Sequence, residues 1–241
     1  MWQAFNYFPI RWLARLIMFL TGWTPLSEAQ IYRMKSIERS IYIFPHSSIW
    51  DFGVTTLFAL AQPEAFEDIY GVMKPQPFET WLGPYLRSAG FIPATRRETT
   101  GNGFVENTIK FLEPKDRFHL LIAPRGARDA TKWKTGYYWI AKQMKVPVVV
   151  VGCDFEHRVP IIGHSYHIDD YANIEELEVD LKKAAGMIVP LHPKGSCIRV
   201  RHHRTPHLVQ WYKLFCFLFI GTTLLYMYSG LCCKYRLAAC I

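Results

Sequence analysis

The stretch IYIFPHSSIWD, residues 41–51, decides the local fold and the candidate chemistry of this chain. Its first four residues have the composition of a β-strand, whereas DFGVTTLFALA, which starts at Asp51, is typical of a helix. His46 therefore leaves a strand and Asp51 enters the next helix, so that the two side chains can meet across the turn. The carboxylate would hold one ring nitrogen of the histidine, and the other could take a proton from a substrate hydroxyl.

The same spacing has a structural alternative. A capping box would use Ser48 as the helix N-cap and Asp51 three residues later. A His-x-x-x-x-Asp pair is common by chance, so the choice between capping and catalysis depends on the rest of the chain.

Strand-like and helix-like segments alternate along the chain. Apolar runs typical of strands cover residues 41–44, 69–73, 91–95, 118–123, 146–152 and 164–168. Helical patterns cover residues 51–61, 78–88, 103–112, 136–145 and 174–185. This alternation predicts an α/β domain with a largely parallel sheet flanked by helices. The apolar run VPVVVVG at residues 146–152 is typical of a strand that is buried on both faces.

Length and charge narrow the class of protein. A chain of 241 residues has room for one catalytic domain with a large core and short appendages. The net charge of +8 suits an anionic membrane surface, an anionic substrate or nucleic acid. We expect no nucleic-acid partner, because half of the residues are hydrophobic and the basic clusters border apolar segments.

The cysteines predict neither a disulfide framework nor a metal site. Only Cys153 and Cys197 of the six lie in the expected globular part, so a reducing compartment is the simplest inference. His157, His164 and His167 lie near Cys153, but their spacing matches no familiar zinc pattern. We therefore expect no metal.

An uncharged segment near the end of the chain has the properties of a membrane-spanning helix. Residues 214–233, LFCFLFIGTTLLYMYSGLCC, have the length that a helix needs to cross a bilayer. The alternative is a buried hairpin or core helix. The preceding segment 199–213 is far more basic than the tail 234–241, so the positive-inside rule predicts that the catalytic domain faces the cytosol.

The first residues of the chain have a different pattern. Arg11 and Arg15 interrupt apolar and aromatic residues, and the uncharged stretch from Leu16 is too short to span a bilayer. This pattern indicates a helix lying in the membrane interface, and a helix packed on the domain's own core fits it equally well. The predicted organisation is an interface region at 1–36, the α/β catalytic domain at 37–198, a basic juxtamembrane loop at 199–213, a transmembrane helix at 214–233 and a tail at 234–241.

Two basic clusters follow predicted strands. The sequence GFIPATR, residues 90–96, ends in Arg96, whose planar guanidinium suits a bidentate grip on phosphate. The sequence APRGAR, residues 123–128, supplies Arg125, Arg128 and a glycine, Gly126, that permits close backbone approach to a ligand. Each cluster predicts an anion site, and a solvated basic loop is the alternative for both.

The order of these motifs resembles the glycerolipid acyltransferases, the group that contains 1-acylglycerol-3-phosphate acyltransferase. Four blocks appear in the family's order: His-x-x-x-x-Asp at 46–51, Gly…Arg at 90–96, a counterpart of Pro-Glu-Gly-Thr-Arg at 124–128, and an apolar Val-Pro block at 146–149. The resemblance extends over residues 38–170.

The resemblance implies a membrane-bound enzyme of phospholipid biosynthesis. Such an enzyme moves a fatty acyl group from acyl-CoA or acyl carrier protein to a hydroxyl of a lysoglycerolipid such as lysophosphatidic acid. The resemblance makes His46 the general base, Asp51 its orienting partner, and Arg96 and Arg128 ligands of the acceptor's phosphate. The donor thioester is already activated, so no cofactor or covalent intermediate is needed. Backbone N–H groups near Gly126 are candidates for stabilising the oxyanion.

The third block departs from the family. Arg125 and Ala127 stand where the family has glutamate and threonine, so local charge rises and a hydroxyl donor is lost. We expect Arg125 to point into the acceptor pocket and to favour a more anionic acceptor. The alternatives are an acyltransferase with a different lyso-lipid acceptor and a catalytically silent lipid-binding membrane protein. The sequence indicates no oligomeric state.

Overall fold

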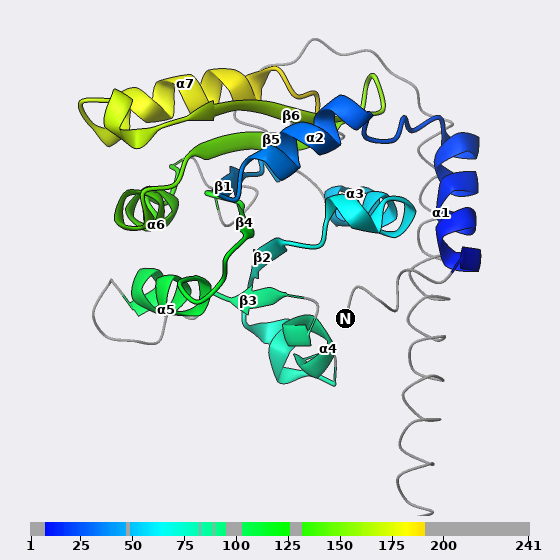
Figure 1. Cartoon of the computed structure of the whole chain (residues 1–241), viewed down its shortest axis with the longest axis horizontal. Coiled ribbons are helices and arrows are strands. Elements are labelled where there is room, and N and C mark those ends of the chain that lie inside the picture. Colours follow the sequence, from blue (N-terminus) through cyan, green and yellow to red (C-terminus); the bar gives the residue numbers. More distant parts are fainter. Residues whose placement is uncertain are drawn as a thin grey trace, which may run out of the picture. The chain divides into compact units, whose positions relative to one another are not determined.

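The computed structural model describes residues 8–46, 49–81, 83–88, 90–94, 103–125 and 132–190, and these form a six-stranded sheet flanked by helices (Figure 1). The strands are β1 (Arg39–Ile43), β2 (Ile69–Met73), β3 (Phe91–Pro93), β4 (Phe118–Ile122), β5 (Val148–Asp154) and β6 (Val159–Tyr166). The helices are α1 (Phe8–Thr21), α2 (Glu28–Ser36), α3 (Ile49–Ala61), α4 (Gly83–Ser88), α5 (Gly103–Leu112), α6 (Gly136–Met144) and α7 (Ile174–Gly186). Three short 3-10 helices are η2 (Pro63–Ala65), η3 (Gln76–Glu79) and η4 (Ile168–Asp170).

The sheet is mixed, with the strand order β3-β2-β4-β1-β5-β6. β1 pairs in parallel with β4 and β5, and β2 pairs in parallel with β3 and β4. Only β6, at one edge, runs antiparallel to its neighbour β5. The predicted α/β fold is therefore confirmed, and β5 is buried at every position, as its apolar run predicts.

Helices cover both faces of the sheet and bury its central strands. α5 and α6 lie on one face, α2 and α3 lie on the other, and α1 lies outside α3 (Figure 1). The main core lies on the first face, where side chains from β1, β4 and β5 pack against α5, α6 and α7. This arrangement leaves the ends of the parallel strands, rather than the faces of the sheet, as the place for a site.

Most predicted elements differ from the observed ones by one or two residues at their ends, and three differences are larger or change the type of element. Prolines explain two of these three. The segment 78–88 is divided into η3 and α4 because Pro77 and Pro84 each fit the first turn of a new helical segment but not a helix interior. β6 begins at Val159 rather than at residue 164, because an edge strand tolerates Pro160. Residue 168, assigned to that strand, instead begins η4.

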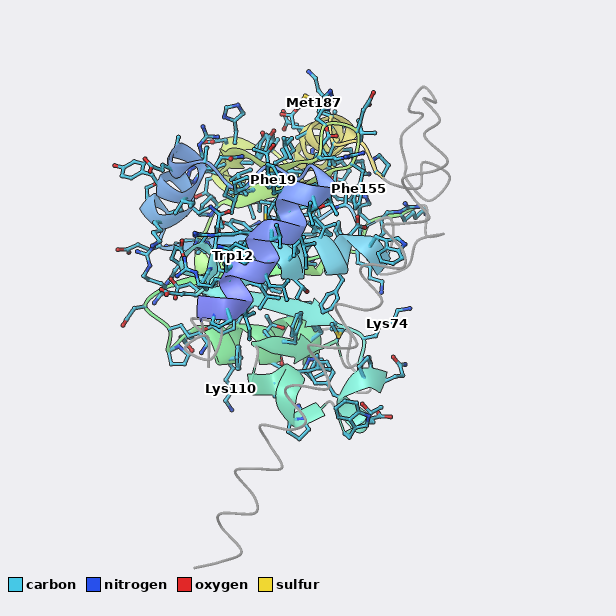
Figure 2. All side chains as sticks on the ribbon, turned by 90° about the vertical axis from the view of Figure 1, so that its right-hand side faces the viewer. Trp12, Phe19, Lys74, Lys110, Phe155 and Met187 are labelled. Carbon is cyan, nitrogen blue, oxygen red and sulfur yellow. The ribbon has the colours of Figure 1, made fainter. Side chains whose placement is uncertain are left out.

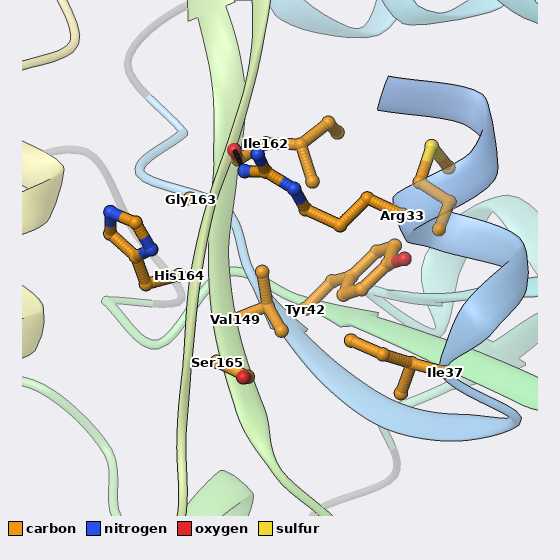
Figure 3. A pocket seen from close by; sticks show the side chains of 9 residues that line it. Arg33, Ile37, Tyr42, Val149, Ile162, Gly163, His164 and Ser165 are labelled. Atoms are coloured by element: carbon orange, nitrogen blue, oxygen red, sulfur yellow. Dashed lines mark hydrogen bonds between the residues drawn. The ribbon is translucent and has the colours of Figure 1, made fainter. Parts of the chain in front are cut away.

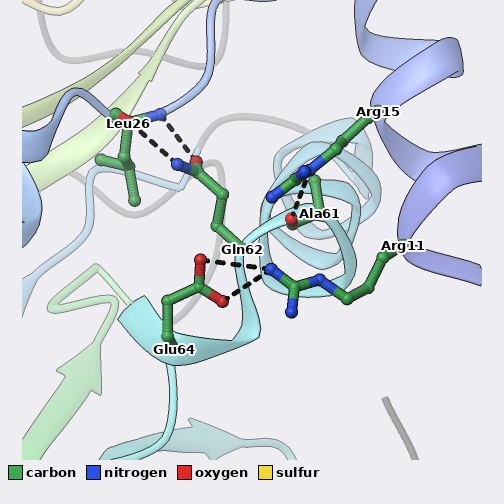
Figure 4. Close-up of polar contacts among 6 residues, drawn as sticks. All are labelled: Arg11, Arg15, Leu26, Ala61, Gln62 and Glu64. Carbon is green, nitrogen blue, oxygen red and sulfur yellow. Dashed lines mark hydrogen bonds and ion pairs between the residues drawn. The ribbon is translucent and has the colours of Figure 1, made fainter. Parts of the chain in front are cut away.

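α1 packs one face on the domain and leaves an apolar face exposed. Its buried residues Ala14, Ile17 and Met18 lie on the side of α3. Two arginines add polar contacts: Arg11 pairs with Glu64 at 3.1 Å, and Arg15 donates to the carbonyl of Ala61 at 3.1 Å (Figure 4). Packing on the domain's own core, one of the two sequence interpretations, is therefore observed.

The outer face of α1 is large and apolar. It carries Trp12, Leu13, Phe19 and Leu20, of which Phe19 is 80 % exposed. Figure 2 labels Trp12 and Phe19 on this helix. None of the helices in the described ranges is long and apolar enough to cross a membrane. The predicted transmembrane segment 214–233 lies outside the described residues.

Candidate active site

The candidate site lies at the carboxyl end of the central parallel strands. β1 ends at Ile43, and the backbone N–H of His46 then donates to the carbonyl of Phe44 at 2.8 Å. α3 begins at Ile49, so Asp51 lies in its first turn, where the helix dipole favours a carboxylate. The local sequence thus places a histidine just after a buried strand and a carboxylate just inside the following helix.

His46 and Asp51 are in contact. The Nδ1 of His46 lies 3.1 Å from Oδ2 of Asp51. The Asp51 side chain is 5 % exposed, whereas the His46 side chain is 39 % exposed. The buried carboxylate therefore fixes the ring through Nδ1, and Nε2 is the nitrogen that can face a substrate. Ser48, the alternative N-cap, lies outside the described residues.

A cavity of about 130 Å³ opens beside this pair. It is lined by residues that follow β1 and β4, by residues of α3 and β5, by Trp133, and by residues of α7 and the segment after it: Phe44, Pro45, His46, Asp51, Pro124, Arg125, Trp133, Gly152, Cys153, Lys182, Ala185, Ile188 and Pro190. The structure thus brings together His46, Asp51 and Arg125 of the predicted site. The other predicted residues, Arg96, Gly126 and Arg128, lie outside the described residues, as does Ala127.

Two lining residues outside the predicted site, Lys182 and Trp133, carry side-chain N–H donors. Lys182 of α7 contacts Glu178 one turn earlier, with Nζ 2.5 Å from Oε2. The same ammonium lies 5.6 Å from the centre of the Trp133 ring. The i,i+4 spacing of Glu178 and Lys182 predicts their ion pair from sequence. No local pattern indicates that this pair borders the cavity of His46.

The cavity also contains a thiol, which is unsuited to nucleophilic attack. Cys153 is buried, and its Sγ lies 3.8 Å from Oγ1 of Thr55 in α3. Burial raises the pKa of the Cys153 thiol to about 12, so the thiol is protonated at neutral pH. Because only the thiolate is a good nucleophile, an acyl-cysteine intermediate is disfavoured here.

The remaining histidines near Cys153 do not cluster with it. His157 pairs instead with Asp154 at 3.1 Å, and this hydrogen bond raises its pKa. Within the described ranges, no three His, Cys, Asp or Glu side chains are arranged to hold a metal ion.

A second cavity, of about 290 Å³, lies elsewhere in the fold (Figure 3). It is lined by α2, β1, β5 and β6, and it includes Arg33, Tyr42 and His164. The Arg33 guanidinium donates to the carbonyl of Ile162 at 3.4 Å. This cavity has no counterpart of the His46–Asp51 pair among its lining residues, so we place the candidate chemistry in the smaller cavity.

Comparison with known proteins identifies the family. Residues 28–154 match the sequence model of the Acyltransferase family. The structure is similar to the 1-acyl-sn-glycerophosphate (LPA) acyltransferase PlsC from Thermotoga maritima, with a TM-score of 0.43 and 14 % identity over 76 % of this chain and 90 % of that chain. No curated protein matches the chain. The residues matched to the family include His46, Asp51, Arg125 and Trp133, whereas α7 follows them.

Proposed function

Because the chain belongs to the Acyltransferase family, as its motifs predicted, we propose that it acylates a hydroxyl of a lysoglycerolipid such as lysophosphatidic acid. The donor in this proposal is acyl-CoA or acyl carrier protein. The observation that carries it is the 3.1 Å contact between His46 and Asp51 beside a cavity. A carboxylate that holds one ring nitrogen leaves the other nitrogen oriented to act as a general base.

The proposed reaction begins with proton transfer to His46. Nε2 takes the proton of the acceptor hydroxyl as that oxygen attacks the thioester carbonyl carbon. The tetrahedral oxyanion then collapses, the carbon–sulfur bond breaks, and the leaving thiolate recovers the proton from His46. Asp51 fixes the ring and stabilises the imidazolium that forms between the two transfers. Backbone N–H groups near Gly126 remain the proposed donors to the oxyanion.

The charge of the cavity favours an anionic substrate. Arg125 lines it where the family has glutamate, so a guanidinium replaces a carboxylate beside the reacting groups. A guanidinium binds phosphate through paired hydrogen bonds. We therefore propose an acceptor that carries phosphate, with Arg96 and Arg128 as its further ligands.

Two segments support action at a membrane. The outer face of α1 exposes Trp12, Leu13, Phe19 and Leu20, an apolar and aromatic surface suited to the lipid interface. The uncharged residues 214–233 supply a proposed spanning helix, with the catalytic domain on the cytosolic side. Both the acceptor lipid and the product would then stay in the bilayer.

A direct assay tests this proposal. The full chain, purified in detergent, is supplied with labelled acyl-CoA or acyl carrier protein and a panel of lysolipids. We expect an acylated product with a phosphate-bearing lysolipid, and loss of that product in His46→Ala. Binding of lysolipid without any product would instead favour the silent lipid-binding alternative. If product forms only with a different lysolipid, the proposed acceptor is wrong and the proposed acyl transfer stands.

A further inference from the structure

α7 adds a second cation to the catalytic cavity. Lys182 lies on this helix, beyond the residues that match the family, and it lines the same cavity as His46 and Arg125. Its side chain is 44 % exposed, so the ammonium can meet a ligand without losing all of its hydration. A carboxylate, Glu178, holds the ammonium at 2.5 Å.

Trp133 provides an independent observation in the same place. Its side chain lines the cavity, it is only 8 % exposed, and the Lys182 ammonium lies over its ring at 5.6 Å from the centre. Within the part of the chain that the structure describes, the indole Nε1 is a buried donor with no hydrogen-bond partner. A buried donor without a partner is costly, and native proteins keep few of them. A substrate oxygen would supply the missing acceptor.

The Lys182 ammonium and the Arg125 guanidinium are positively charged, and the indole N–H of Trp133 is a neutral donor. Together these groups favour an anionic ligand with several acceptor oxygens. A phosphate group presents several oxygens, so one can accept from the ammonium while another accepts from the indole N–H.

We propose that Lys182 and the indole N–H of Trp133 bind a substrate phosphate at this cavity. Glu178 is a positioning residue that directs the ammonium. This inference rests on the proposed acyl transfer and assigns a specificity role to a helix outside the family match. The phosphate belongs either to the lysolipid acceptor or to the acyl donor, and the kinetic constants of the two substrates separate these sources.

The first test compares two neighbouring lysines of α7. Lys182→Met keeps the aliphatic stem over Trp133 and removes the charge, whereas Lys183→Met makes the same charge change at an exposed position outside the cavity. We expect Lys182→Met to raise one substrate's KM about tenfold or more, as for a lost charged hydrogen bond. Lys182→Arg should recover most of this loss, and Lys183→Met should behave as wild type.

Two acceptors then locate the phosphate. With a neutral acceptor, monoacylglycerol, the effect of Lys182→Met should disappear if the acceptor's phosphate is bound. It should persist as a raised KM for acyl-CoA with every acceptor if the donor's phosphate is bound. An unchanged KM for both substrates would overturn the inference, and so would a fall in kcat alone.

The second test removes one proton donor and keeps the ring. Trp133→Phe should raise the same KM about threefold to tenfold, since it deletes a single hydrogen bond. Trp139→Phe, at an exposed tryptophan, is the matched control. If Trp133→Phe and the wild type have equal kinetic constants, the indole N–H does not bind the substrate phosphate.

A binding measurement separates this inference from the proposed reaction. If the wild-type chain transfers no acyl group, the proposed function fails, and titration with lysophosphatidic acid and monoacylglycerol in detergent still tests the site. Tighter binding of the phosphorylated lipid that is lost in Lys182→Met would support the site. Equal binding by wild type and Lys182→Met would refute it.

Discussion

Two histidines lie at opposite ends of the parallel strands and differ in exposure. At the carboxyl end, the His46 side chain is 39 % exposed, contacts the buried carboxylate of Asp51 and lines the cavity. At the amino end, His119 of β4 is only 4 % exposed. His119 shares a 2.8 Å hydrogen bond with Ser40 and stacks on Tyr42, both in β1. Burial lowers the pKa of His119 to about 4, so this ring stays neutral at physiological pH.

The difference shows how surroundings give one residue type two roles. A ring held by a carboxylate and open to a cavity can gain and lose a proton during a reaction. A ring held by a hydroxyl and covered by other side chains can only keep its hydrogen bond. The first ring is suited to catalysis, and the second ties β1 to β4. Four predictions test this division.

The largest effect is expected from His46→Ala. Removing the base should lower kcat by about 10²–10⁴-fold, with little change in the free energy of unfolding. Turnover of labelled acyl-CoA and chemical unfolding measure the two quantities. A variant with wild-type turnover would place the base elsewhere.

Asp51→Asn should have an equal or smaller effect on kcat. The amide keeps the shape of the side chain but removes the charge that orients the ring and stabilises the imidazolium. The substrate KM values should change little, because Asp51 acts through His46. A large rise in KM with unchanged kcat would contradict this positioning role.

At the amino end, stability should fall between pH 6.5 and pH 4. The pKa of His119 is lowered from 6.5 to about 4 in the folded chain, so the unfolded chain takes up the proton first as pH falls. The contribution of His119 to the free energy of unfolding is therefore fully present above pH 6.5. It is lost as the pH falls toward 4, by at most about 3 kcal/mol for one proton. Urea unfolding in detergent at stepped pH measures it. His119→Phe should lack this share of the pH dependence, and an equal dependence in both proteins would contradict the assignment.

At neutral pH, His119→Phe should cost about 1–3 kcal/mol of stability, because the buried hydroxyl of Ser40 loses its partner. His119→Asn should cost less, since its amide can still form a hydrogen bond. Both variants should keep the wild-type kcat in the acyl-transfer assay. A fall in kcat as large as that of His46→Ala would show that His119 also affects the reaction, and it would contradict the division of roles.

The sequence predicted the parts of the site that are local. His46 and Asp51 lie on one continuous strand–turn–helix, so composition and spacing sufficed to bring them together. Arg125 was predicted because it follows a buried strand, and parallel strands end at the same edge.

The parts that were missed depend on tertiary packing. Lys182 reaches the cavity only because α7 packs beside β5, and Trp133 belongs to the buried cluster that includes Leu177 and Leu181 of α7. The capping box of Ser27 and Gln30 predicts the start of α2 from sequence. The predicted interface region 1–36 nevertheless contained no separate helix at this place. The start of β6 was obscured by Pro160, which is compatible with an edge strand but not with a central one.

The central position of β1 has a consequence for biosynthesis. Ile41 pairs with Leu120 on one side and with Val148 on the other, so β1 lacks both neighbours until much of the chain has left the ribosome. Such long-range pairing makes sheet formation slow. α1 precedes all six strands in the chain, so its amphipathic sequence leaves the ribosome before any of them. If α1 binds lipid as proposed, that binding can begin before the sheet is complete.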